Sequence, residues 1–267
     1  MKIFTTKKWR LALLPLIAVV AISSCKKKDR TDDPVPNVQQ RLSKIEQNAT
    51  NYITFGYTAK GLLNKFKSVN DNLSSEAEFV YDNTSNQLMT GSWDGFNMEF
   101  SRKNNLLDRV YFTPDATNPA SDEHYLKFSY ANGRVSQTVD YVAEGNGFIP
   151  RAKHTYEYYA NGDVKSQTYY YLAAMPDQWE QLERNVYEYE DMKNARQIPD
   201  EVAYTCYMSK SVHNLKKIMS YDASNALDET ITYTSTYNNL GLPTTALVNI
   251  TYPNSPAISF TLKYSYQ

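Results

Sequence analysis

Tyr130-Ala-Asn-Gly-Arg-Val-Ser-Gln-Thr138 and Tyr159-Ala-Asn-Gly-Asp-Val-Lys-Ser-Gln-Thr168 are two copies of one phrase that differ by one substitution and one insertion. Alternating apolar and aromatic residues precede each copy: Leu126, Phe128 and Tyr130 in the first, Tyr156 and Tyr158 in the second. Such alternation is typical of half-buried strands, and Asn-Gly favours a tight hairpin turn. The stretch from Glu123 to Thr168 therefore predicts two similar hairpins. The inserted Lys165 would reverse side-chain facing unless a β-bulge absorbs it.

Weaker copies of the phrase recur along the rest of the chain, roughly 16 to 32 residues apart, a period typical of repeated supersecondary units. They are Phe55-Gly-Tyr57 with Gly61, Phe79 to Asp82 with Asn86 to Leu88, Tyr187 to Tyr189 with Lys193-Asn194, Ser220 to Asp222 with Asn225 to Leu227, and Thr236 to Asn238 with Gly241-Leu242. From Val38 onward a period of two dominates, and Asp94-Gly95 is the strongest single hairpin turn.

The sequence predicts an all-β fold: one long antiparallel meander of about 16 strands that forms a strongly curved sheet or a partly closed barrel. A meander of that length must coil or close, because only then are its second face and its edges covered. Residues 38–267 are expected to form a single domain. Within it, Glu201–Met208 is predicted as a strand and Met175 to Trp179 as a loop.

The N-terminus has the pattern of a bacterial targeting segment. Lys2, Lys7, Lys8 and Arg10 precede an apolar run from Leu11 to Ile22, which at 12 residues is shorter than a membrane-spanning helix requires. The following Ser23-Ser24-Cys25 resembles a lipobox. This resemblance implies a lipoprotein signal peptide at 1–24, lipidation of Cys25, and a disordered tether over 25–37. The alternative is an ordinary secretory signal with a chance cysteine.

A lipid on Cys25 implies a membrane partner and an outer-membrane location. Lys26, Lys27 and Lys28 precede the acidic residues of the tether, so the sequence leaves open whether the domain faces the surface or the periplasm. Removal of residues 1–24 removes four of 28 Lys and Arg residues and none of the 29 acids, which leaves a net charge of −5. Without a basic stripe, a nucleic-acid partner is not expected. With Cys25 lipidated, Cys206 has no disulfide partner and is predicted to be a buried strand residue.

Arg41-Leu-Ser-Lys-Ile45, followed by Phe-x-Tyr, a glycine turn and Leu-x-x-x-Phe, resembles lipoproteins of an unknown-function family that is described as porin-like and is of Bacteroidetes type. Phe79-Val-Tyr-Asp82 and Ser220-Tyr-Asp222 are similar to the Tyr-Asp hairpin repeats of Rhs-type proteins. The resemblance implies a curved antiparallel sheet on a lipid anchor. It implies no activity and carries over no functional residue.

The sequence contains no nucleophile elbow, phosphate loop, CxxC pair or HExxH motif, and His124, His154 and His213 lack metal-ligand spacing. We therefore expect no enzyme activity, no metal and no cofactor, although two of the many carboxylates could form a glycosidase pair.

Exposed aromatic rings can stack on sugars, which makes Trp93, Trp179, Tyr169 and Tyr171 the candidate ligand-stacking residues. The alternative is that both tryptophans cap the core of the sheet. The leading hypothesis is a non-enzymatic, lipid-anchored outer-membrane protein that binds a glycan or a protein. A structural or assembly role in the cell envelope and a carrier of apolar ligands are the alternatives. The carrier requires small, apolar inward positions, whereas the inward positions are expected to be largely tyrosine.

Overall fold

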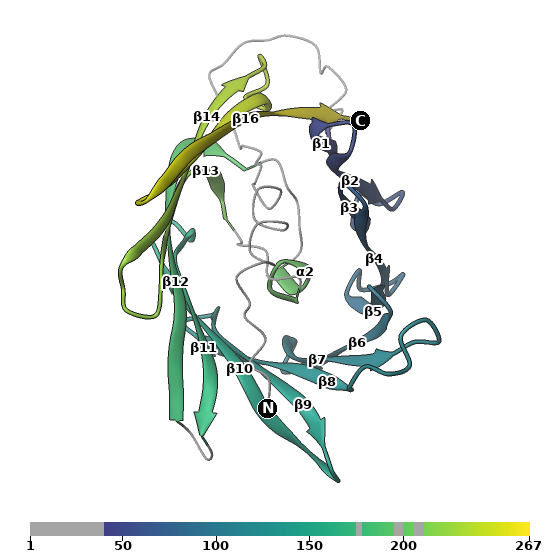
Figure 1. Cartoon of the computed structure of the whole chain (residues 1–267). Coiled ribbons are helices and arrows are strands. Elements are labelled where there is room, and N and C mark those ends of the chain that lie inside the picture. Colours follow the sequence, from purple (N-terminus) through teal and green to yellow (C-terminus); the bar gives the residue numbers. More distant parts are fainter. Residues whose placement is uncertain (1–39, 175–177, 195–199, 206–210) are drawn as a thin grey trace.

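The computed structural model of this protein describes residues 40–174, 178–194, 200–205 and 211–267. Within these residues, sixteen strands form a ring around a lumen, and one short helix lies inside the ring (Figure 1). The elements are β1 (Leu42–Asn48), β2 (Asn51–Tyr57), β3 (Leu63–Asn70), β4 (Leu73–Tyr81), β5 (Leu88–Trp93), β6 (Phe96–Lys103), β7 (Leu106–Pro114), β8 (His124–Ala131), β9 (Arg134–Glu144), β10 (Gly147–Tyr158), β11 (Val164–Ala174), β12 (Gln178–Lys193), α2 (Asp200–Thr205), β13 (His213–Tyr221), β14 (Leu227–Tyr237), β15 (Pro243–Tyr252) and β16 (Ser255–Tyr266).

The sheet is one closed antiparallel barrel in which each strand pairs with the next along the chain and β1 pairs with β16. At this closing seam Leu42 lies opposite Tyr266, and the backbones of Arg41 and Gln267 exchange two hydrogen bonds of 2.9 Å. Closure leaves neither β1 nor β16 with an unpaired edge. The predicted all-β meander is confirmed. Of the two expected shapes, a strongly curved sheet and a partly closed barrel, the barrel forms, and it is closed completely.

The predicted turns form where the sequence places them. Asp94 and Gly95 have φ angles of 47° and 84°, and Asn132 and Gly133 have 52° and 74°, as a two-residue hairpin turn with two positive φ angles requires. The second Asn-Gly copy differs, because β10 ends at Tyr158 and β11 begins only at Val164. The register between β10 and β11 shifts at Glu157/Tyr158 and skips Lys165, so a bulge absorbs the inserted residue as predicted.

The two faces of the barrel wall differ in chemistry. Tyr156 contacts Tyr204 of α2, which lies inside the ring, with ring centroids 5.1 Å apart, so the face that carries Tyr156 is the inner one. Cross-strand partners share a face, and on this inner face Phe55, Phe66 and Ala77 are opposite one another and at most 8% exposed. Most of the buried inner positions are leucine, isoleucine, valine or phenylalanine, so the expectation of a largely tyrosine interior is wrong.

The outer face carries charged side chains throughout the ring. Lys65 lies opposite Glu78 and Lys67 opposite Glu76, and their charged groups form ion pairs at 2.7 and 3.5 Å. Glu46 and Lys263 face each other across the closing seam, and Glu188 and Lys217 form a pair on β12 and β13. Alternation along these strands thus puts apolar residues in the lumen and charges on the outside, whereas on β9 the inner face also carries Asp140, opposite Leu126.

Tyrosines repeat at one end of the barrel, which we call the tyrosine end; the described chain begins and ends there. Six even-numbered strands carry a tyrosine at or near this end, and its hydroxyl donates a hydrogen bond of 2.6–3.0 Å to a backbone carbonyl near the start of the preceding strand. The pairs are Tyr57 with Leu42, Tyr81 with Leu63, Tyr130 with Leu107, Tyr158 with Val135, Tyr189 with Val164 and Tyr266 with Pro243. On β6, Arg102 donates in the same way to the Leu88 carbonyl.

This repeat explains why tyrosine is abundant. Each ring fills the inner face near the turn, while its hydroxyl satisfies a carbonyl of the preceding strand, at the register shift between that strand and its other neighbour. Burial raises the pKa of Tyr81 and Tyr189, which keeps both hydroxyls protonated as donors. The weakly conserved copies of the phrase along the sequence therefore correspond to a repeat in the structure.

The prediction of a strand at Glu201–Met208 is wrong for its described part, because Asp200–Thr205 forms α2. Glu201-Val-Ala-Tyr204 reads equally well as a strand or as a helical turn, and burial of Val202 and Tyr204 in the lumen decides for the helix. Cys206 lies outside the described residues, as do Cys25 and residues 1–37 of the predicted signal and tether. Among the described helices none is long and apolar enough to cross a membrane.

Candidate functional site

The connection between β12 and β13 spans residues 194 to 212 and carries α2 into the lumen. Glu201 forms an ion pair with Arg102 of β6 at 3.2 Å. On the other side, the hydroxyl oxygens of Tyr204 and Tyr158 of β10 lie 2.6 Å apart. Because Tyr158 donates its own proton to Val135, Tyr204 is the donor of this bond. These contacts hold α2 between two separate parts of the barrel wall.

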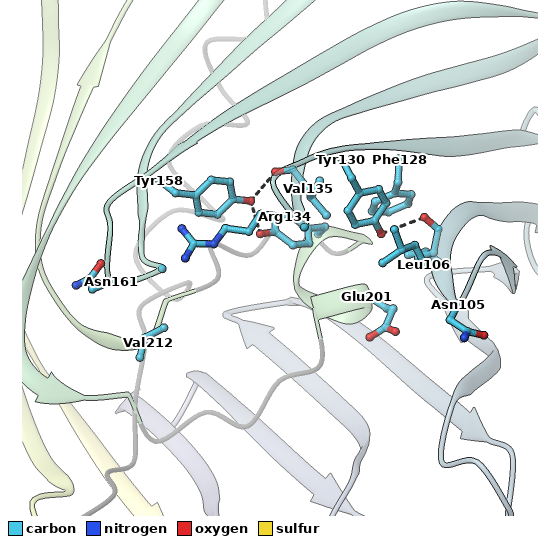
Figure 2. Close-up of a pocket in the computed structure, with 14 residues that line it drawn as sticks. Asn105, Leu106, Phe128, Tyr130, Arg134, Val135, Tyr158, Asn161, Glu201 and Val212 are labelled. Atoms are coloured by element: carbon cyan, nitrogen blue, oxygen red, sulfur yellow. Dashed lines mark hydrogen bonds between the residues drawn. The ribbon is translucent and has the colours of Figure 1, made fainter.

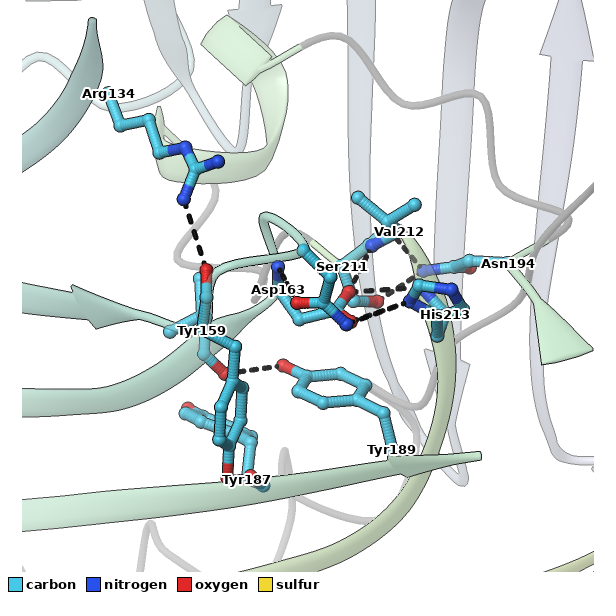
Figure 3. A network of polar contacts seen from close by, with 11 residues as sticks. Arg134, Tyr159, Asp163, Tyr187, Tyr189, Asn194, Ser211, Val212 and His213 are labelled. Carbon is cyan, nitrogen blue, oxygen red and sulfur yellow. Dashed lines mark hydrogen bonds and ion pairs between the residues drawn. The ribbon is translucent and has the colours of Figure 1, made fainter. Parts of the chain in front are cut away.

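A buried carboxylate holds the end of this connection where it joins β13 of the barrel wall (Figure 3). Asp163, which is fully buried, accepts hydrogen bonds from the backbone amides of Val212 and His213. Its second oxygen lies 2.7 Å from Nδ1 of His213 and 2.8 Å from the amide nitrogen of Asn161. The second Asn-Gly loop thereby clasps the first residues of β13 and sets the position of the segment that follows α2.

A cavity of about 540 Å³ lies between α2 and the wall formed by β7 to β10 (Figure 2). Its aromatic lining consists of Phe128, Tyr130, Tyr158 and Tyr204. Leu106 and Val212 also line it and are 45% and 39% exposed, which gives the cavity an apolar rim. Its volume falls within the roughly 300–1,000 Å³ of small-molecule sites.

The polar groups that line the cavity differ in how many hydrogen-bond and ion-pair partners they have in the protein. The hydroxyls of Tyr130 and Tyr158 are bonded to backbone carbonyls, and Glu201 is paired with Arg102. Arg134 lies with its guanidinium carbon 5.4 Å from the centre of the Tyr158 ring and donates from Nη1 to the Tyr159 carbonyl at 3.2 Å. Among the described residues Arg134 has no ion pair, so its guanidinium keeps donors for an anion.

A second cluster of polar side chains lines the inner wall on β10 to β12. His154 stacks on Tyr169, with ring centroids 4.7 Å apart and an interplanar angle of 16°, and its Nδ1 lies 3.0 Å from the amide nitrogen of Gln167. The hydroxyl of Tyr187 donates to the Gln167 carbonyl oxygen at 3.0 Å. Burial lowers the pKa of His154 to about 4, so this imidazole is neutral at physiological pH.

The lowered pKa of His154 predicts a pH-dependent stability. Between about pH 6.5 and pH 4 the unfolded chain binds a proton on this histidine and the folded chain does not, so the contribution is complete above pH 6.5 and is lost as the pH falls. The expected slope is about 1.4 kcal/mol per pH unit. We expect His154→Phe to flatten the profile of unfolding free energy in this window, measured by urea titration. A profile as steep as that of the wild type would contradict the prediction.

The structure does not bring the four sequence-predicted stacking residues together. Trp93 is half-buried at the end of β5 and donates its indole N–H to the Ser75 hydroxyl at 2.9 Å. Tyr169 and Tyr171 lie on the inner face of β11, and Tyr171 is bonded to Glu180. Trp179 belongs to β12 rather than to the expected loop, and the Lys153 ammonium sits 4.5 Å from its ring centre on the outer face. Strands β5 and β12 occupy different parts of the ring.

The residues that the structure brings together around the cavity were noted in the sequence only as part of the repeated hairpin pattern. Tyr130, Arg134 and Tyr158 belong to the repeated phrase or to the strand that precedes it, and their repetition masked their second role as cavity lining. One signal could have found Arg134: it stands where the second copy has Asp163. Among the described residues no group of three His, Cys, Asp or Glu side chains could hold a metal ion.

Comparison with known proteins gives similarity in fold alone. No family model matches the chain, and no curated protein matches it. The solved structure of a porin-like protein from Bacteroides uniformis is 12% identical with a TM-score of 0.57, and the match covers 88% of this chain and 98% of the other. A porin-like protein from Bacteroides vulgatus is 10% identical with a TM-score of 0.53, covering 85% of this chain and 99% of the other. The chain thus has a porin-like β-barrel fold.

Proposed function

We propose that this protein is a lipid-anchored, non-enzymatic binding protein of the outer membrane. Its barrel stands in water beside the bilayer, held by the lipid on Cys25, and its lumen binds a small ligand. The porin-like fold of the two solved Bacteroides structures supports a place in the cell envelope. The lipobox-like Ser23-Ser24-Cys25 supports the anchor.

The distribution of charge on the barrel wall carries this proposal. A membrane-spanning barrel turns an apolar band toward lipid and a polar face toward its lumen, and a lysine or arginine on the lipid face costs about 2–4 kcal/mol at the midplane. Here the arrangement is reversed, with Phe66 and Ala77 inside and the Lys65, Lys67, Glu76 and Glu78 cluster outside. A wall of this kind favours water on its outer side and apolar contacts on its inner side.

The same observation favours the lumen as the binding surface. The apolar core on the inner face and the aromatic wall of the cavity beside α2 support a ligand in the lumen, as in the apolar-ligand carrier that the sequence alone ranked below glycan binding. The candidate glycan-stacking rings are divided between the two faces of the wall and between distant strands. A lumen ligand is therefore the better supported of the two.

Cleavage of the tether distinguishes a lipid anchor from a spanning barrel. A recognition site for a specific protease is inserted between Pro34 and Val35, and washed outer membranes are treated with that protease. We expect the barrel to move from the membrane pellet to the supernatant after cleavage and to stay in the pellet without it. We expect Cys25→Ala to abolish incorporation of radiolabelled palmitate. Retention of the cleaved barrel in the pellet would show that the wall itself is embedded.

The same inserted site reports which side of the outer membrane the domain faces. Protease added to intact cells cleaves the tether if the domain is displayed at the surface. If it faces the periplasm, cleavage requires permeabilised cells. Immunoblotting of the cells and of the medium reads both outcomes.

A further inference from the structure

We propose that the cavity beside α2 binds a small amphipathic carboxylate, with its apolar body against the aromatic wall and its carboxylate on Arg134. This inference rests on the proposed function, because it names the class of ligand for the lumen. It goes further in assigning a residue to each half of that ligand.

The apolar half of the site comes from β7, β8 and Val212, which directly precedes β13. Phe128 of β8 is 4% exposed and forms part of the buried core, and Tyr130 follows it on the same strand. Figure 2 shows these two rings side by side, with Leu106 of β7 next to them. Because the Tyr130 hydroxyl is already bonded to the Leu107 carbonyl, this ring presents mainly apolar surface to the cavity. Leu106 and Val212 are exposed apolar side chains at its rim, where an apolar ligand would cover them.

The part of the site that would bind the ligand's carboxylate follows from the charges that face the cavity. Glu201 is neutralised by Arg102, whose nitrogen lies 3.2 Å from the carboxylate, so this pair adds no net charge. Arg134 is left as the net positive charge of the lining. One guanidinium nitrogen is fixed by the Tyr159 carbonyl and the Tyr158 ring lies beside the group, which limits its rotamers. A guanidinium held in this way is suited to a carboxylate, which it binds with two parallel hydrogen bonds.

Ligand binding to variants of the whole lipidated protein in nanodiscs tests the inference. The probes are 4-phenylbutanoate and its neutral analogue 4-phenylbutan-1-ol, with octanoate as an acyclic carboxylate. Their affinities are measured by isothermal titration calorimetry, with empty nanodiscs as the blank for partition into lipid. We expect saturable binding of both carboxylates. We also expect Arg134→Gln to weaken carboxylate binding roughly ten- to hundredfold, the usual effect of removing a hydrogen bond to a charged group.

Two controls separate this site from general attraction of anions. Arg184 is also an arginine beside a tyrosine ring, at 4.5 Å from the centre of Tyr221, but it lies on the outer face, so Arg184→Gln should leave the affinities unchanged. Arg134→Gln should leave the weaker binding of the alcohol unchanged, because the alcohol makes no ion pair. Leu106→Trp adds bulk at an exposed rim position and should block all three probes, while Leu73→Trp, at another exposed leucine, should block none.

Three results would overturn the inference: no saturable binding of either carboxylate, equal affinity for acid and alcohol, or an equal effect of Arg134→Gln and Arg184→Gln. These failures are distinct from failure of the lipid anchor. Release of the barrel by tether cleavage together with absent probe binding would leave the anchored barrel standing and remove the carboxylate site.

Discussion

Replacement of Asp163 with alanine is expected to lower the free energy of unfolding by about 3–5 kcal/mol, because it leaves several buried hydrogen-bond donors without their acceptor. Asp163 is fully buried, and its two oxygens accept from the backbone amides of Val212 and His213 and from the side chain of Asn161. Alanine leaves these donors without an acceptor, and unsatisfied buried donors cost about 1–3 kcal/mol each. The loss should be local as well as global, because this clasp holds the segment after α2.

Guanidinium-induced unfolding followed by tyrosine and tryptophan fluorescence measures the change. The matched control is Asp222→Ala, which removes a carboxylate that caps the exposed turn of Ser224 and Ala226 and should cost only about 1 kcal/mol. Amide hydrogen exchange should show faster exchange for Val212 and His213 in the Asp163 variant, with β2 to β5 unchanged. Equal losses for the two variants would show that the buried clasp contributes no more than a surface turn.

Truncation of Leu63 to alanine is expected to cost about 2.7–5.0 kcal/mol, the range found for buried leucines whose removal leaves a cavity. Leu63 is 0% exposed at the first position of β3, and similar buried residues begin other odd-numbered strands at Leu42, Leu88 and Val164. The Tyr81 hydroxyl donates a hydrogen bond to the backbone carbonyl of Leu63, and the alanine variant keeps this bond because it keeps the carbonyl. The predicted loss is therefore a packing loss and not a hydrogen-bond loss.

Leu73→Ala is the matched control, since Leu73 begins β4 and is 65% exposed. Its expected effect is within about 0.5 kcal/mol, as for most surface substitutions. Both variants are compared with the wild type by chemical denaturation, with the transition slope checked for a change in the surface exposed on unfolding. A loss below about 1 kcal/mol for Leu63→Ala would mean that the wall relaxes into the space, against the expected close packing of the inner face.

The local features of this fold could be predicted from the sequence because they depend on neighbouring residues. Asp94-Gly95 and Asn132-Gly133 form tight turns since both central residues adopt positive φ angles, which few other residue pairs tolerate. Lys165 falls in a bulge since Val164 and Gln167, three residues apart, both lie on the inner face, and a strict period of two cannot keep both there. The number of strands and their antiparallel order follow from the repeated alternation and the short turns.

Tertiary structure decided the closure, α2 and the candidate site. Closure depends on the sum of small twists and register shifts over the whole ring, such as the pairing of Leu42 with Tyr266, and no local pattern contains that sum. The six residues of α2 are too few for periodicity to separate helix from strand, so their burial in the lumen decided. Arg102 and Glu201, or Arg134 and Val212, meet across long stretches of chain because the ring carries them to one cavity. The alternation of apolar and aromatic residues was visible in the sequence, but only the closed ring determines which face is the inside.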